Sequence, residues 1–358
     1  MDAALQQIID EIHPVDGTWI KKAKERTARL VMPPRALGKL HDMGEKLCGI
    51  QQTLNPRTGK KAVLVMAGDH GVVKEGVNPF PQEITGEMVR TFLKQGAGIN
   101  AIAGCVGADV WVADLGVIPD LMALSLSHPE RLLIRKIRKG TDNLARGPAM
   151  SHGDAIRSIL TGFELAETLF KKETDILATG DMGIGNTTPS AAIGMVITGK
   201  TAKEMVGRGT GVDDQGLIQK RKVVQMGIEI NRPDPKDGVD VLAKVGGFEI
   251  GGIAGCILAG AVSRRPVVID GFISTAGALI AHALCPSVTD YLFAGHCSAE
   301  QGHRLMLAHL GLDPILNLNM RLGEGTGAAL AMGILDGAVR VFRDVLTFEQ
   351  ADVTEKRP

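Results

Sequence analysis

Cysteine is sparse in this sequence, and aromatic side chains are few for its length. The cysteines show no Cys-x-x-Cys or other spacing of a metal site, so we expect reduced thiols in a cytoplasmic protein that binds no metal ion. They are Cys48, Cys105, Cys256, Cys285 and Cys297. Aromatic residues make up 3% of the chain, whereas glycine occurs 45 times. That composition favours an α/β enzyme with many tight turns over an all-β or disordered protein.

The chain also lacks an excess of charge and a long hydrophobic run. Its 40 Lys and Arg residues balance 40 Asp and Glu residues, so no basic face is expected to bind nucleic acid or an anionic membrane. The longest apolar run, 251–262, is interrupted by glycines and falls far short of the ~20 residues that span a bilayer. Residues 1–12 are few and carry acidic groups, so we expect no secretory signal. Small molecules are the expected partners.

Short runs rich in β-branched residues alternate with helical patterns along the chain. Six of these runs predict strands, at 62–66, 110–114, 175–179, 267–270, 291–294 and 315–318. Because the runs are apolar on both faces, they indicate parallel strands covered by helices on two sides. The expected fold class is α/β.

The first residues of the chain differ from the rest because they show helical patterns only. These patterns cover 3–12, 18–29 and 35–50, and prolines separate them. The apolar residues of the segment 326–345 also have helical spacing, and this segment is expected to pack beside the N-terminal helices. We therefore predict a small helical domain from residues 1–55 and 335–358, and a large α/β domain from 56–334.

The segment 178–191, ATGDMGIGNTTPSA, predicts an anion site. A short apolar strand runs into a turn that contains Gly180, Gly183 and Gly185, and a helix follows near Pro189. Unpaired N–H groups and the positive end of the helix dipole converge at such a turn, which suits a phosphate or carboxylate. The alternative is a glycine-rich structural turn without a ligand.

Polar or glycine-rich turns follow the other predicted strands as well, and the carboxyl ends of parallel strands border one crevice. After the first strand, Asp69 and His70 are either an acid/base pair or a hydrogen-bonded structural element. Near the fifth strand, His296 and Glu300 lack a third metal ligand, so a metal site is a weak hypothesis. Ser298 is either a hydroxyl donor or a helix cap.

A second anion site is predicted in 207–222, GRGTGVDDQGLIQKRK. The glycines, among them Gly209, form a flexible turn, Asp213 can cap the next helix, and Lys220 lies about two turns into it. Successive helical positions point about 100° apart, so at most one or two of Lys220, Arg221 and Lys222 can face the turn. A solvated helix face is the alternative.

Glu324 stands in RLGEGTGAAL, after the last predicted strand and before a helix. Its glycine neighbours let the main chain bring the carboxylate close to a ligand, and partial desolvation would raise its pKa, as suits a general base. The alternative is that Glu324 merely favours a helix N-terminus.

Taken together, the motifs resemble one enzyme family. GDHGV, KGTDNLARGPAM, GDMGIGNTTPSAA, VGRGTGVDD, GGFEIGGIAG, DGFISTAGAL, AGHCSAEQGH and LNMRLGEGTGAAL resemble, in order and over nearly the whole chain, the nicotinate-nucleotide:dimethylbenzimidazole phosphoribosyltransferases of cobalamin biosynthesis. The resemblance implies transfer of the 5-phosphoribosyl group from nicotinate mononucleotide to 5,6-dimethylbenzimidazole, which gives α-ribazole 5′-phosphate and nicotinate. It also implies a homodimer, with a six-stranded parallel Rossmann-like sheet and a small helical domain in each chain.

The resemblance also implies roles for individual residues. Glu324 matches the general base that removes a proton from the benzimidazole. The turns for the phosphoribosyl group and its phosphate hold Gly183, Gly209, Lys220, Gly271 and Ser298, and the base pockets are lined by Asp181, Arg321, Leu322, Gly323, Asn78, Pro81 and Gln82. Family members often have glutamate where this chain has Asp181, so direct contact of its shorter side chain with the acceptor is an open question.

Two other functions stay open from the residues alone. VVIDGFISTAG is superficially similar to the acidic loop of magnesium- and phosphoribosyl-pyrophosphate-dependent transferases, but Gly271 follows Asp270 where those enzymes usually have a second acid. A nucleotide-sensing module without catalysis would keep the glycine turns and lose Glu324. For the main hypothesis no cofactor is expected, because the pyridinium of the nucleotide is already an activated leaving group.

Overall fold

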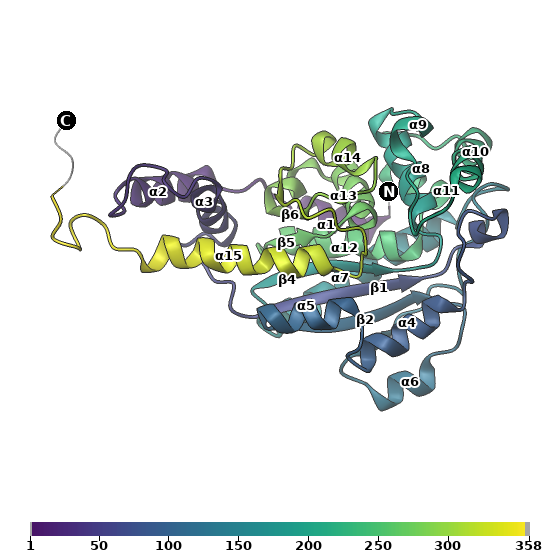
Figure 1. Ribbon diagram of the computed structural model, residues 1–358, viewed down its shortest axis with the longest axis horizontal. Helices are drawn as coiled ribbons and strands as arrows, with labels where there is room; N and C mark the ends of the chain where they lie inside the picture. The colour runs from purple at the N-terminus through teal and green to yellow at the C-terminus, as the bar shows by residue number, and fades with distance from the viewer. Residues whose placement is uncertain (1, 355–358) are drawn as a thin grey trace.

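The centre of the molecule is a parallel β-sheet, seen in a computed structural model that describes residues 2–354 (Figure 1). Its strand order is β3-β2-β1-β4-β5-β6-β7, and every neighbouring pair is parallel. The strands are β1 Lys61–Gly68, β2 Ala108–Gly116, β3 Leu132–Ile134, β4 Ile176–Met182, β5 Val267–Ile269, β6 Leu292–His296 and β7 Pro314–Leu316. The α/β prediction is confirmed.

The sheet has seven strands, so the expected number of six was wrong. Each predicted run became a strand, and the missed one is β3 at the edge of the sheet. Its three residues lie within RLLIRKIRK, which is too short and too basic to show a strand pattern. The pairing is made by the backbone: the Val112 N–H donates to the Arg131 carbonyl at 2.8 Å, and the Arg135 N–H donates to the Asp114 carbonyl at 2.9 Å.

Helices cover both faces of the sheet (Figure 1). One face carries α7 (His152–Lys171), α12 (Phe248–Val262) and α13 (Phe272–Leu284), and the other carries α4 (Ile84–Leu93), α5 (Gly98–Val106) and α15 (Thr326–Asp344). Glycine explains how tightly α7 and α12 pack, since a Cβ on Gly162 would lie 1.9 Å from the Gly252 carbonyl oxygen. The helix backbones therefore touch, and no larger side chain fits between them.

The remaining helices complete the layers around this sheet. They are α1 Ala3–Asp10, α2 Gly17–Ala28, α3 Lys39–Gln51, α6 Met122–Ser127, α8 Thr187–Thr198, α9 Ala202–Met205, α10 Asp214–Asn231, α11 Gly238–Val245 and α14 His303–His309, with 3₁₀ turns at Gly71–Glu75 and Pro286–Tyr291.

The two ends of the chain meet in a helical group beside the sheet, at the left of Figure 1. Here α2 and α3 pack with the C-terminal half of α15 around a small separate core of Ala23, Cys48 and Phe342. An isolated bridge joins Leu30 to Thr347. Helix α1 instead contacts α12, and its Leu5 is buried in the main core. Whether this group is a separate domain stays a prediction, and its residues 355–358 lie outside the described part of the chain.

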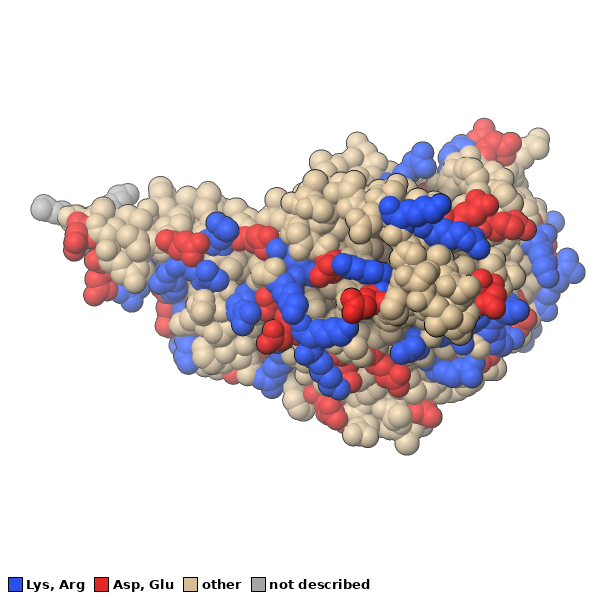
Figure 2. Space-filling model, turned by 90° about the horizontal axis from the view of Figure 1, so that it is seen from below, with Lys and Arg blue, Asp and Glu red and all other residues tan. Residues whose placement is uncertain are grey.

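The surface mixes charges of both signs. On the face drawn in Figure 2, Lys and Arg side chains alternate with Asp and Glu side chains rather than forming one basic area. Within residues 2–354, no helix combines the length and the apolar character that crossing a membrane requires.

The strand order reverses direction at the centre of the sheet. From β1 the chain moves outward to β2 and β3, and from β4 it moves outward on the other side to β7. Such a switch point opens a crevice at the carboxyl ends of the two central strands. Residues after β1 and at the end of β4 therefore border the place where a ligand is expected.

Candidate active site

Glu324 lies in a tight turn between β7 and α15. Three consecutive residues, Gly323, Glu324 and Gly325, have φ values of +85°, +64° and +88°, so the non-glycine residue adopts a left-handed conformation that costs energy. Its carboxylate is buried and accepts a hydrogen bond from the Ile99 N–H, in the first turn of α5, at 3.1 Å. Burial raises the pKa of Glu324, the Ile99 N–H opposes this, and the charge of Asp270 adds to it. The side chain is thus a buried carboxylate of raised basicity.

Asp181 lies at the carboxyl end of β4, beside the Glu324 turn. A Cβ on Gly323 would lie 3.2 Å from its Oδ2, so a larger residue at 323 would crowd the carboxylate. The Asn186 amide donates to Oδ2 at 2.9 Å, while buried Oδ1 has no hydrogen-bond partner among the described residues. Burial, and after it the charge of Asp270, raises the pKa of Asp181 well above its usual range. Asp181 and Glu324 are therefore neighbours in one acidic group.

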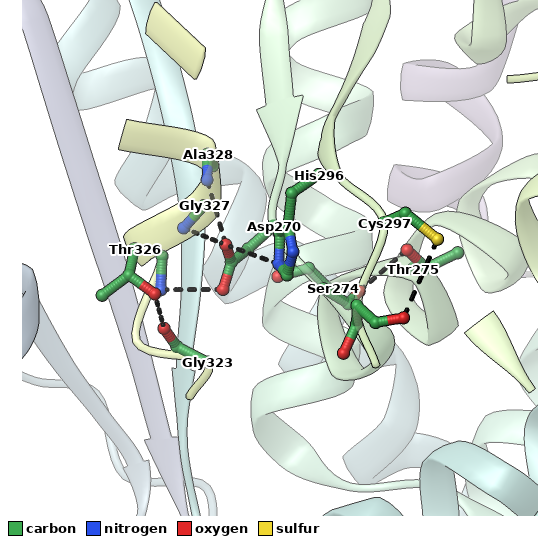
Figure 3. Close-up of polar contacts among 12 residues, drawn as sticks. Asp270, Ser274, Thr275, His296, Cys297, Gly323, Thr326, Gly327 and Ala328 are labelled. Atoms are coloured by element: carbon green, nitrogen blue, oxygen red, sulfur yellow. Dashed lines mark hydrogen bonds and ion pairs between the residues drawn. The ribbon is translucent and has the colours of Figure 1, made fainter. Parts of the chain in front are cut away.

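Asp270, at the end of β5, caps helix α15 (Figure 3). Its Oδ2 accepts the Gly325 N–H at 3.1 Å, and its Oδ1 accepts the N–H groups of Gly327 at 2.7 Å and Ala328 at 3.0 Å. The ring of His296 lies behind it, with Nε2 3.5 Å from Oδ1. Burial raises the pKa of Asp270, whereas His296 and the three N–H donors stabilise its ionised form.

Asp69 and His70 follow β1 and do not pair with each other. Asp69 accepts the Ile118 N–H at 2.8 Å, and His70 Nε2 lies 2.8 Å from Oε1 of Glu249, at the start of α12. Burial alone would lower the pKa of the His70 imidazole, but the Glu249 carboxylate outweighs it and the pKa is raised. The structure thus gives Asp69 a structural hydrogen bond and makes Glu249 the partner of His70.

Lys220 faces the glycine turn, in agreement with the helical spacing of its basic triplet. It is 1% exposed on α10, and its Nζ donates to the Thr187 hydroxyl, at the start of α8, at 2.6 Å. A Cβ on Gly209 would lie 3.0 Å from Nζ, so the turn touches the ammonium group. Burial lowers the pKa of Lys220 to about 8, although Glu300 opposes that shift. Both predicted anion turns therefore meet at one buried cation.

Gly271 and Ser298 are joined by a chain of hydrogen bonds through His303. The Ser298 N–H donates to His303 Nδ1 at 2.8 Å, so the ring proton is on Nε2, which lies 2.8 Å from the Thr275 hydroxyl. That hydroxyl donates to the Gly271 carbonyl at 2.8 Å. Burial lowers the pKa of His303 to about 3, so the ring is neutral. Ser298 Oγ accepts the Glu300 N–H at 3.2 Å and caps a turn rather than α14.

The predicted base-pocket residues lie nearer the surface. Arg321 and Leu322 are exposed, although Leu322 contacts Gly98 beside Glu324. In the 76–82 loop Asn78 is half-buried and Pro81 is exposed. The Gln82 amide donates to the His70 carbonyl at 3.0 Å, which ties this loop to the end of β1. Gly183 lies there too, since a Cβ on it would stand 3.2 Å from His70 Nε2.

Three buried residues of the site, Glu249, Asp270 and His303, could not be predicted as site residues from the sequence. Glu249 is a single acid in the apolar helix FEIGGIAGCILAG, and that contrast was the available signal. The only sequence signal at Asp270 is that no second acid follows it. His303 gave no signal, because its partners are five and 28 residues away.

The assembled site combines a buried acidic group with a buried cation. The charges of Asp270, Glu249 and Glu324 all raise the pKa of Asp181 at the end of β4, and the charge of Asp270 also raises the pKa of Glu324. Lys220 lies on the anion turns beside them. Such carboxylates can take up a proton and stabilise positive charge, while Lys220 can bind a phosphate. In the part of the chain that the structure describes, no group of three or more His, Cys, Asp and Glu side chains has the arrangement to hold a metal ion.

Comparisons with known proteins agree over nearly the whole chain. Residues 12–353 match a family described as Phosphoribosyltransferase. The chain is 50% identical, over 98% of both sequences, to the nicotinate-nucleotide–dimethylbenzimidazole phosphoribosyltransferase of Geotalea uraniireducens, and 49% identical, over 99% of both, to that of Desulforudis audaxviator. The crystal structure of CobT from Thermus thermophilus superposes with a TM-score of 0.89 at 44% identity, covering 95% of this chain and 100% of that one.

Proposed function

The chain belongs to the family of nicotinate-nucleotide–dimethylbenzimidazole phosphoribosyltransferases, and from this membership we propose the reaction that it catalyses. The enzyme transfers the 5-phosphoribosyl group of nicotinate mononucleotide to 5,6-dimethylbenzimidazole. One ring nitrogen of the acceptor forms a bond to C1′ as the bond from C1′ to the pyridinium nitrogen breaks. The electron pair of that bond leaves with nicotinate, the acceptor loses its N–H proton, and inversion at C1′ gives α-ribazole 5′-phosphate.

Glu324 is the general base of this proposal. The observation that carries it is a buried carboxylate of raised pKa that is held by one N–H donor in a strained glycine turn. One lone pair of Oε2 is used by Ile99, and the remaining lone pairs can accept the benzimidazole proton. A base works best when its pKa is close to the working pH, and burial moves Glu324 in that direction.

The phosphate of the nucleotide is proposed to bind at Lys220. Support comes from the closeness of Gly209 to the ammonium group and from the Thr187 hydroxyl at the start of α8, where the helix dipole also favours an anion. Gly183, Gly271 and Ser298 are the proposed contacts for the phosphoribosyl group. A bound dianion would also keep Lys220 protonated, because it offsets the burial that lowers the pKa of this side chain.

Positive charge develops at C1′ as the glycosidic bond breaks. The carboxylate of Asp181, buried at the end of β4, is proposed to stabilise it together with Glu324. The pyridinium ring leaves as neutral-ring nicotinate, so no pyrophosphate has to be stabilised.

The acceptor is proposed to lie between the Glu324 turn and the 76–82 loop. Arg321, Leu322 and Gly323 would form one wall, and Asn78, Pro81 and Gln82 the other. The tie from Gln82 to the His70 carbonyl supports this, because it holds the loop near the acidic group. The shorter side chain of Asp181 would leave its contact with the acceptor dependent on the size of that acceptor.

We also propose that the protein is a cytoplasmic homodimer in which α2, α3 and the end of α15 form a small domain. Apolar side chains of this helical group are exposed, among them Leu37 and Leu346. Exposed apolar side chains on one group favour an interface. Sedimentation of the purified protein would test this: a single species of one chain's mass contradicts the dimer.

The reaction is tested with the purified protein, nicotinate mononucleotide and 5,6-dimethylbenzimidazole. Mass spectrometry would detect α-ribazole 5′-phosphate and nicotinate in equal amounts, and proton NMR would assign the anomer. A parallel reaction with phosphoribosyl pyrophosphate and magnesium tests the other transferase hypothesis. Product from that donor alone would refute the proposal.

A further inference from the structure

The strained turn that carries Glu324 is held from both sides. Before Glu324, the Gly323 carbonyl accepts two hydrogen bonds from Thr326, from its N–H at 3.1 Å and from its hydroxyl at 2.8 Å. After Glu324, the Gly325 N–H donates to Asp270 (Figure 3). Glu324 is the single residue between these two anchors, so its direction depends on both.

Asp270 also fixes the helix that follows. Its three N–H partners are spread over Gly325, Gly327 and Ala328, which spans the left-handed turn and the start of α15. A charged acceptor with three donors makes stronger hydrogen bonds than a neutral one. Because the carboxylate is fully buried and comes from the end of β5, it ties the turn to the centre of the sheet.

His296 supports Asp270 from the neighbouring strand β6. A Cβ on Gly327 would lie 2.0 Å from the Cδ2 atom of the His296 ring, so the ring packs directly on the helix start that Asp270 caps. A Cβ on Gly295 would likewise lie 2.7 Å from the Cα of Ala328. Small residues at these positions let β6, the imidazole and α15 lie in contact, and the ring leaves Asp270 little room to move.

We infer that Asp270, supported by His296, is the positioning residue of the general base: it holds Glu324 in its left-handed turn with the carboxylate directed at the acceptor. This inference rests on the proposed function. Asp270 acts through the backbone of residues 325–328, and its negative charge also faces Glu324. The other titratable groups of the site are Asp181 on β4 and, beyond it, Glu249 on α12, while α5 contributes the Ile99 N–H.

The test is Asp270→Asn, assayed for α-ribazole 5′-phosphate formation beside the wild-type enzyme and Glu324→Gln. The amide cannot accept all three N–H donors and carries no charge. If Glu324 is no longer held in position, kcat should fall by about 10- to 100-fold. The dissociation constant for nicotinate mononucleotide, measured by calorimetry, should change by less than about threefold. Loss of the charge should also move the acid limb of the kcat profile to lower pH, because the pKa of Glu324 would fall.

Two further variants separate positioning from general damage. Asp114→Asn is the matched control, since Asp114 is also fully buried at a strand end and accepts a backbone N–H, from Val117 at 2.8 Å. It should lower the melting temperature and leave the acid limb in place. His296→Gln should lower kcat less than Asp270→Asn does, with unchanged nucleotide binding.

The outcomes are distinct. No product from the wild-type enzyme refutes the proposed function rather than the positioning role. An active wild type with Asp270→Asn at normal kcat and an unmoved acid limb overturns the inference. If Asp270→Asn does not fold, normal kcat in His296→Gln overturns it as well, because the ring would then not support the base.

Discussion

Replacing Glu324 by glutamine removes the proposed base and should leave the shape of the site intact. The amide has nearly the same size, and its carbonyl oxygen can accept the Ile99 N–H that now binds Oε2 at 3.1 Å. The left-handed turn is set by Gly323, Gly325 and their partners, so the backbone has no reason to move. Both substrates should therefore bind as before, and the change should appear in kcat.

The size of the effect follows from what a general base contributes. Proton removal by a positioned side chain is worth about 10²- to 10⁴-fold in rate, which corresponds to about 2.7–5.5 kcal/mol of transition-state stabilisation. The benzimidazole N–H becomes acidic only as its other nitrogen bonds to C1′, so the loss belongs to the transition state. At neutral pH the folded Glu324→Gln variant should be more stable than the wild-type protein. The raised pKa of Glu324 means that its ionised form is less favourable in the folded than in the unfolded chain, and the substitution removes this cost.

The assay is steady-state kinetics with both substrates varied, followed by proton NMR of the product and a thermal melt. Glu167→Gln is the control, since Glu167 lies on α7 in an exposed ion pair with Lys171. It should leave kcat within about twofold. Near-normal turnover in Glu324→Gln, with the α anomer as product, would falsify the hypothesis that Glu324 is the general base. The orientation of the two substrates would then be the remaining explanation for the rate.

The remaining predictions concern the nucleotide, the acceptor and metal dependence. Lys220→Ala should weaken nicotinate mononucleotide by about 1.5–3 kcal/mol and the uncharged acceptor hardly at all; equal weakening of both, measured by calorimetry, would contradict a phosphate role. Because burial lowers the pKa of Lys220 to about 8, KM for the nucleotide should rise as the pH passes that value, and a profile that stays flat more than about one pH unit above it would count against the phosphate role. Asp181→Asn should alter the order of preference among benzimidazoles and purines, whereas an unchanged order would restrict Asp181 to shaping its turn. Turnover should survive EDTA, since the donor is already activated; activity lost and then restored by magnesium would favour the pyrophosphate-dependent hypothesis.

Much of the sheet could be predicted from local sequence because its strands are buried on both faces. A run such as KAVLVMAG cannot be accommodated at a surface, and every predicted run became a strand. The edge strand β3 could not be predicted in this way. Two of its three side chains, Leu133 and Ile134, are only partly buried, and the three residues become a strand because the backbone of β2 beside them offers partners.

The site shows the same division between local and distant information. The glycine turns and Glu324 stood out because their composition is unusual within a few residues of chain. Glu249 and His303 did not stand out, because their roles depend on partners in other parts of the fold. These partners are His70 for Glu249, and Ser298 and Thr275 for His303. Asp69 and His70 look like a pair in sequence, yet their side chains take different partners.

The α/β class, the positions of six strands, the glycine turns and the family could all be predicted from the amino-acid sequence. These follow from hydrophobic runs, from backbone freedom at glycine and from motifs, all of which are local properties. The contacts between charged groups, in contrast, depend on how the strands and helices pack. This packing buried Lys220 at both anion turns, placed the Asp270 carboxylate on three N–H groups of a segment 55 or more residues away, and set Glu324 against the start of α5. The reason is physical: a carboxylate or ammonium group acquires its pKa and its direction from burial and from partners, and the packing of strands and helices supplies both.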